Sequence, residues 1–139
     1  MAQATKQKSK DLFKLDESFS SYSIDDVKAA KDFYVETLGI KVTEEKEGGL
    51  GLKLGDTQLY LYPKEDHEPA SFTVLNIAVT DIDAAVAELS SRGVEFESYA
   101  GDIETDENGI FRGGNKGNGP NIAWLKDPSG NILSVIEKK

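Results

Sequence analysis

Apolar residues recur along the chain with two different periods, and these periods predict where helices and strands lie. A helical spacing runs through residues 27–38, where it is carried by Val27, Ala30, Phe33, Tyr34 and Leu38. Runs of strand length surround this segment at 18–24, 41–46, 50–54 and 58–62. Glycine-containing turns separate the last three runs, as in β-hairpins. The first half of the chain is therefore predicted to fold as a strand, a helix and three strands.

The second half of the chain repeats this order. A strand is predicted at 72–79, a helix at 82–91, and further strands at 94–98, 121–125 and 131–136. The stretch SYSIDDVKAAKDFYVETLG at 21–39 aligns with NIAVTDIDAAVAELSSRG at 76–93, with Asp26 against Asp81. A solenoid would need about three or more repeats of ~20–50 residues. We therefore predict an α+β fold in which two tandem βαβββ modules form a pseudo-symmetric pair.

The same pattern divides the chain into a tail and one domain. Residues 1–14 are a polar tail with Lys6, Lys8, Lys10 and Lys14 but without the apolar segment of a secretion signal. Residues 15–139 form the domain, with module one at 15–63, a linker at 63–71 and module two at 72–138. Module two carries a long glycine-rich loop at 99–120, and loops of this length are usually functional or disordered. The sequence leaves open whether this loop is a lid.

Composition excludes several classes of function. The 139 residues carry a formal net charge of -9, which argues against nucleic-acid binding because that requires a basic face. No apolar run approaches the ~18 residues of a membrane span. Cysteine is absent, which removes disulfides and thiolate chemistry and suits a cytoplasmic protein. We expect a cytoplasmic protein without nucleic-acid or membrane partners.

Several spaced motifs together resemble the vicinal oxygen chelate superfamily of glyoxalases, extradiol dioxygenases, fosfomycin-resistance enzymes and bleomycin-resistance proteins. They are the two βαβββ units, the helix sequence AAKDFYVETLGI at 29–40, and DPSGN at 127–131 before the last strand. The resemblance spans residues 18–137 and implies two curled sheets around a cleft, with the helices outside. It also implies a homodimer, because many members complete their clefts at a two-fold interface, sometimes with modules exchanged between chains.

The resemblance further indicates where a metal ion would bind. Metal-dependent members use His or Glu side chains on the cleft face of the first and last strand of each module. The corresponding positions here are Phe19, Tyr60, Val74 and Ser134. None of these is an imidazole or a carboxylate, which are the side chains that bind zinc-like ions in a cysteine-free protein. We therefore expect neither a metal nor another cofactor.

No catalytic residue can be assigned from the sequence. The chain has one histidine, His67, and it lies in the polar linker, so we expect it to be structural and not part of a Ser-His-Asp triad. The glycines of GGNKGNG at 113–119 suggest a phosphate loop only weakly, because the strand–loop–helix context and a following GK[ST] are missing.

Strand alternation predicts which side chains line the cleft. In the fifth strand Leu75 and Ile77 should face the helix, which leaves Val74 and Asn76 for the cleft. The same reasoning in the other strands, with two lid residues from the long loop, gives the lining as Phe19, Ser21, Tyr60, Tyr62, Val74, Asn76, Phe111, Arg112, Ile122, Trp124 and Ser134. A mostly apolar lining with a few hydrogen-bonding groups is typical of a binding pocket. Aromatic faces in an acidic protein suit an aromatic or cationic ligand.

These observations favour a metal-independent protein, similar to the bleomycin-resistance type, that binds a small organic molecule. Two alternatives stay open. One is a metal-dependent lyase, isomerase or dioxygenase of the glyoxalase superfamily, whose ligands would then lie at other positions. The other is a partner-binding module whose cleft is filled by its own aromatic side chains. The sequence does not identify the ligand, nor does it separate drug sequestration from a metabolite-binding role.

Overall fold

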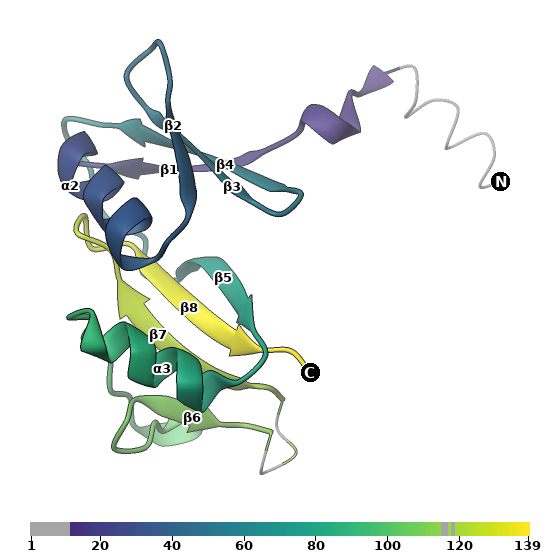
Figure 1. Ribbon diagram of the computed structural model, residues 1–139, viewed down its shortest axis with the longest axis vertical. Coiled ribbons are helices and arrows are strands. Elements are labelled where there is room, and N and C mark those ends of the chain that lie inside the picture. Colours follow the sequence, from purple (N-terminus) through teal and green to yellow (C-terminus); the bar gives the residue numbers. More distant parts are fainter. Residues whose placement is uncertain (1–11, 115–116, 118) are drawn as a thin grey trace, which may run out of the picture.

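The computed structural model describes residues 12–114, 117 and 119–139. Residues 1–11 of the predicted tail and residues 115, 116 and 118 of the GGNKGNG stretch lie outside this description. Within the described residues the chain forms two four-stranded sheets (Figure 1). The first has the order β1 (Ser20–Ile24), β4 (Thr57–Pro63), β3 (Leu50–Leu54), β2 (Lys41–Glu44), and the second has the order β5 (Thr73–Val79), β8 (Ile132–Glu137), β7 (Asn121–Lys126), β6 (Ile110–Arg112).

The two sheets share one topology, which confirms the prediction of tandem βαβββ modules. The first strand of each module pairs in parallel with the last, and the remaining neighbours are antiparallel. The parallel pair requires a crossover, and a helix supplies it in each module. No helix in the described part of the chain is long and apolar enough to cross a membrane.

The crossover helices start in the same way, which explains the aligned aspartates of the two halves. In α2 (Val27–Asp32) the Asp26 carboxylate accepts a hydrogen bond from the backbone N–H of Ala29, at 3.0 Å. In α3 (Ile82–Ser91) Asp81 does the same for Ala84, at 3.1 Å. An N-cap of this kind satisfies a free backbone donor and suits the positive end of the helix dipole. The chain continues from α2 into the π-helical turn η2 (Phe33–Thr37), so the predicted helix at 27–38 is recovered in two pieces.

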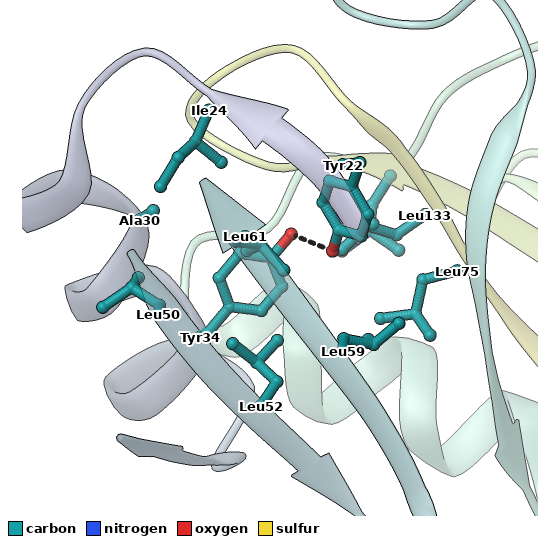
Figure 2. Packing of buried hydrophobic residues seen from close by; sticks show 11 residues of the cluster. Tyr22, Ile24, Ala30, Tyr34, Leu50, Leu52, Leu59, Leu61, Leu75 and Leu133 are labelled. Carbon is teal, nitrogen blue, oxygen red and sulfur yellow. Dashed lines mark hydrogen bonds between the residues drawn. The ribbon is translucent and has the colours of Figure 1, made fainter. Parts of the chain in front are cut away.

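Side chains from the helix-covered faces of both sheets meet in one hydrophobic core. Figure 2 shows this packing around Tyr34 of η2, which is fully buried. The core consists of Tyr22, Ile24, Ala30, Tyr34, Leu50, Leu52, Leu59, Leu61, Leu75, Leu125 and Leu133. A smaller cluster under α3 is made of Ile82, Val86, Ile110, Ala123 and Val135. The opposite face of each sheet points away from the shared core, and we call it the open face of that sheet.

A buried polar network joins the two modules inside this core. The Tyr34 hydroxyl donates to the Asp127 carboxylate at 2.8 Å and lies 2.8 Å from the Tyr22 hydroxyl. Asp127 also accepts from the backbone N–H groups of Ser129 and Asn131, at 2.9 and 2.8 Å. Burial is the main cause that raises the pKa of both tyrosines. The DPSGN turn is therefore a joint that holds module two to module one.

One predicted strand is wrong. Residues 94–100 form no regular strand, although the backbone N–H of Glu97 donates to the carbonyl of Trp124 at 2.8 Å. The alternating Val94 and Phe96 are apolar because both pack against the core. The fourth strand of the second sheet is instead β6, which lies within the segment predicted to be a loop at 99–120. Part of the proposed lid is thus a fixed edge strand.

Candidate functional site

The open face of the first sheet carries the aromatic side chains that strand alternation predicted. In the parallel register Ser21 lies opposite Tyr60 and Ser23 lies opposite Tyr62. The buried residues of the two strands, Tyr22, Ile24, Leu59 and Leu61, alternate with them. Phe19 precedes β1, and 62% of its surface is exposed. The structure thus brings Phe19, Ser21, Tyr60 and Tyr62 to one face. That they bind a ligand stays a prediction.

The three rings on this face form a continuous aromatic surface beside a cavity. Phe19 meets Tyr60 edge to face, with ring centroids 6.4 Å apart, and Tyr60 stacks with Tyr62 at the same separation. The cavity has a volume of about 430 Å³, which is within the range for small-molecule sites. Its lining combines aromatic, polar and charged groups and consists of Phe19, Thr43, Glu45, Glu47, Gly51, Leu52, Lys53, Gln58, Leu59 and Tyr60.

Sequence reasoning missed the two carboxylates of this cavity. Glu45 directly follows β2 and Glu47 lies in the turn before β3, where no residue was predicted to line the cleft. The register gives the signal that could have found Glu45: Thr43 of β2 lies opposite Gly51, and Gly51 lies opposite Tyr60. Residues of the same parity as Thr43 therefore share the open face with Tyr60.

The open face of the second sheet is built around Trp124 and Ser134, which lie opposite each other on β7 and β8. The Ser134 hydroxyl is buried and donates to the Asn76 side-chain carbonyl at 2.6 Å. Tyr99 and Phe111 pack against Trp124, with ring centroids 5.3 and 6.4 Å away. Ile122 lies opposite Phe111 in the ladder. The face is thus partly filled by its own rings, and Tyr99 is a member that sequence reasoning missed.

Phe111 and Arg112 do not lie together as lid residues. Both belong to β6, so they point to opposite faces of the sheet. Phe111 is 7% exposed and packs on Trp124. The Arg112 guanidinium donates to Asp83 of α3 at 2.6 and 3.1 Å and to Asp106 at 3.1 Å. This pairing lowers the pKa of Asp83 and places Arg112 on the helix side, so its predicted cleft position is wrong.

Val74 is also displaced from its predicted position. The register between β5 and β8 shifts between Thr73 and Leu75, and Val74 packs against the core. A β-bulge inserts one extra residue and changes the alternation beyond it. Thr73, which lies opposite Ile132, takes the place on the open face that alternation alone gave to Val74.

The residues at the superfamily's metal positions do not fit a metal ion. After the correction for the bulge they are Phe19, Tyr60, Thr73 or Val74, and Ser134, which offer two aromatic rings, the phenol hydroxyl of Tyr60 and at most two aliphatic hydroxyls. Divalent transition metals bind imidazole, thiolate or carboxylate groups at ~2.0–2.3 Å. Residues 12–114, 117 and 119–139 contain no group of three or more His, Cys, Asp or Glu side chains that could hold an ion elsewhere.

His67 has a serine hydroxyl beside it, which the sequence did not reveal. Its Nδ1 lies 2.6 Å from Ser23 Oγ, and its Nε2 lies 2.9 Å from the carbonyl oxygen of Ser129. Since a carbonyl only accepts, Nε2 carries a proton, and in the neutral imidazole Nδ1 is then the acceptor for the Ser23 hydroxyl. In a catalytic triad a carboxylate would occupy the position of this carbonyl. The contacts favour a structural role, in which His67 ties the linker to β1 and to the DPSGN turn.

The two sheets and their topology define a protein of the tandem βαβββ class. A family model of the Glyoxalase/Bleomycin resistance protein/Dioxygenase superfamily matches residues 20–135, so the chain belongs to this superfamily. No curated protein matches the chain.

Solved structures agree with this assignment. An antibiotic-binding protein, TnmS3 from Streptomyces sp. CB03234, is 27% identical, with a TM-score of 0.60 over 88% of this chain and 97% of that one. A superfamily member from Sphaerobacter thermophilus is 25% identical, with a TM-score of 0.62 over 87% and 97% of the two chains. A lactoylglutathione lyase from Agrobacterium tumefaciens is 17% identical, with a TM-score of 0.59 over 86% and 92%, and shows the shared fold alone.

Proposed function

We propose that this protein binds a small organic molecule on its aromatic open faces without the help of a metal ion. The observation that carries the proposal is that the superfamily's metal-binding side chains are replaced by other residue types at the corresponding positions of this chain. Aromatic rings and hydroxyls stand where an ion would need imidazole or carboxylate ligands, and a cavity of about 430 Å³ lies beside two of these rings, Phe19 and Tyr60. The antibiotic-binding protein at 27% identity supports a binding role of the bleomycin-resistance-like type.

The proposed cleft is completed by a second copy of the chain. Within one chain the buried faces of the two sheets share a core, so the open faces point in different directions. Phe19 and Tyr62 leave 62% and 36% of their surface exposed on the first sheet and are joined through Tyr60 into one aromatic patch, and contiguous exposed patches mark interaction sites. A homodimer in which the first sheet of one protomer faces the second sheet of its partner would cover them.

The binding proposal is tested by titrating a library of aromatic fragments into 15N-labelled protein. Binding should shift the amide signals of residues near Tyr60, and Tyr60→Ala should abolish these shifts while the melting temperature changes little, because the ring lies on the open face. Phe72→Ala is the matched control, since Phe72 is an exposed aromatic residue that does not line the cavity. Equal effects of the two substitutions on binding would count against the proposed site.

The enzyme alternative makes a different prediction. A lyase, isomerase or dioxygenase of this superfamily would take up one divalent ion per site, with ligands at positions other than those that alignment with the family gives. The second sheet favours the other alternative, a partner-binding module with a filled cleft, in one respect, because Tyr99 and Phe111 already cover Trp124. The first sheet favours ligand binding, because its rings are exposed beside an open cavity.

A further inference from the structure

We infer that the cavity on the first sheet recognises the cationic group of its ligand, an amine or a quaternary ammonium, through Tyr60, Phe19 and the carboxylates of Glu45 and Glu47. This conclusion rests on the proposed function and adds the chemical class of the ligand. Three features of the cavity carry it: the position of the Glu45 carboxylate, the negative charge of the two carboxylates beside the neutral Tyr60 ring, and the lack of an ion-pair partner for either acid among the described residues.

The Glu45 carboxylate lies over Gly51 on the open face. A Cβ atom added to Gly51 would come within 2.6 Å of Glu45 Oε2, so a side chain at this position would collide with the carboxylate. Gly51 lies opposite Tyr60 in the ladder between β3 and β4. The absence of a side chain at Gly51 therefore leaves room for the Glu45 carboxylate beside the Tyr60 ring. The carboxylate and the ring can then contact the same bound cation.

The Tyr60 ring lies against the β2–β3 turn that carries Glu47. A Cβ on Gly49 of this turn would come within 2.5 Å of the ring. The pKa of Tyr60 is raised, first by desolvation of the phenol and then by the negative charge of Glu47, with a further contribution from Glu45. Both carboxylates thus act on the same ring. A negative potential around an aromatic face favours a cation placed over that face.

The charges of the cavity are not balanced within the described protein. Its lining holds the two carboxylates and one ammonium group, that of Lys53. The ion pairs formed among residues 12–114 and 119–139 involve other acids than Glu45 and Glu47. The neighbouring Glu44 is paired with Lys31 of α2, on the helix side of the sheet. Neither acid that faces the cavity is thus paired with a cation in the described part of the chain, although Glu47 also accepts a hydrogen bond from the Tyr60 hydroxyl.

Choline and 3,3-dimethyl-1-butanol form a matched pair of probes, because they have nearly the same shape and differ in the positive charge. Titration followed by NMR should show choline bound at least about fivefold more tightly than the alcohol, the size expected of a partly solvated cation–π contact. Glu45→Gln should lower choline affinity by about fivefold and leave the affinity for the alcohol unchanged. Lys53→Gln should strengthen choline binding, because it removes a like charge.

Glu44→Gln is the control for net charge, since it removes the carboxylate of the residue next to Glu45, on the opposite face of the sheet. It should leave choline affinity within about twofold of the unmodified protein, because an exposed charge on the far side is screened. Thermal melts of each variant show whether the fold is kept. Equal affinities for choline and the alcohol, or equal effects of the two Glu→Gln changes, would overturn the inference.

The outcomes separate this inference from the proposed function. If neutral aromatic fragments bind at Tyr60 but choline has no advantage over its isostere, the open face is a binding site without a preference for cations, and only the inference fails. If neither fragments nor choline bind there, both fail.

Discussion

The hydroxyl groups of Tyr22 and Tyr34 should contribute unequally to stability, although they bond to each other. Tyr34 donates its proton to Asp127, so Tyr22 must be the donor between the two hydroxyls. Tyr34→Phe removes a charge-assisted bond from a buried carboxylate and also leaves the Tyr22 hydroxyl without its acceptor. Tyr22→Phe removes only the hydrogen bond between the two hydroxyls.

The expected losses of stability follow from the free energies that these hydrogen bonds contribute. A hydrogen bond between neutral groups contributes ~1 kcal/mol, and one to a charged group contributes ~1.5–3 kcal/mol. We therefore expect Tyr22→Phe to lower the free energy of unfolding by about 1 kcal/mol and Tyr34→Phe by about 2–4 kcal/mol. The double variant should cost less than the sum of the two, because it no longer contains a buried hydroxyl without an acceptor.

Urea unfolding of the three variants, followed by circular dichroism, measures these free energies. The denaturant slope should stay constant if only stability changes. The reasoning on donor direction would be refuted by a Tyr22→Phe variant that is as destabilised as Tyr34→Phe, or by strict additivity in the double variant.

Three further predictions concern pH, the linker histidine and a helix cap. The pKa of Tyr22 and Tyr34 in the folded protein is raised above the ordinary value of 10.0, so their contribution to stability is complete below that pH and is lost as pH rises above it. Urea unfolding at pH 8–11 should show a smaller loss for the double Phe variant than for the unmodified protein. His67→Ala should lower the free energy of unfolding by ~1–2 kcal/mol, because the hydrogen bonds of the imidazole to Ser23 and Ser129 are lost. A loss near zero in the same assay would contradict a structural role for His67. Asp81→Ala should cost ~1 kcal/mol through the lost cap, and Asp81→Asn should restore most of it, unless the carboxylate charge alone is responsible.

The architecture was predictable because the sequence repeats its own local chemistry. Asp26 and Asp81 sit at equivalent caps, and alternation in β1 and β4 correctly separates the buried Tyr22 and Leu61 from the exposed Tyr62. Such signals are local, so they can be recognised in the sequence without knowledge of the neighbouring strands.

The errors have in common that they depend on contacts distant in the sequence. Val94 and Phe96 alternate because they pack under the core, not because they pair with a strand. The bulge before Leu75 and the ion pairs of Arg112 with Asp83 are set by the neighbouring β8 and α3. Glu45 becomes a site residue only through the register of β2, β3 and β4. None of these relations can be read from the period of apolar residues.

The joint in the core has a consequence for the site. Because the DPSGN turn and Tyr34 fix one module against the other, the directions of the two open faces are set by a rigid network and not by the linker. A second copy of the chain would then find both halves of its cleft already formed. The equilibrium molecular mass in solution should accordingly be that of a dimer.

Independence from metal is the central claim, and one measurement tests it directly. The purified protein is incubated with zinc, nickel, manganese or iron(II), its metal content is determined by elemental analysis, and affinity for a bound fragment is then measured with and without excess chelator. We predict no stoichiometric metal, no change in the melting temperature, and the same affinity in both conditions. One metal ion per site, together with a raised melting temperature and an affinity that the chelator abolishes, would contradict the account and favour an enzyme.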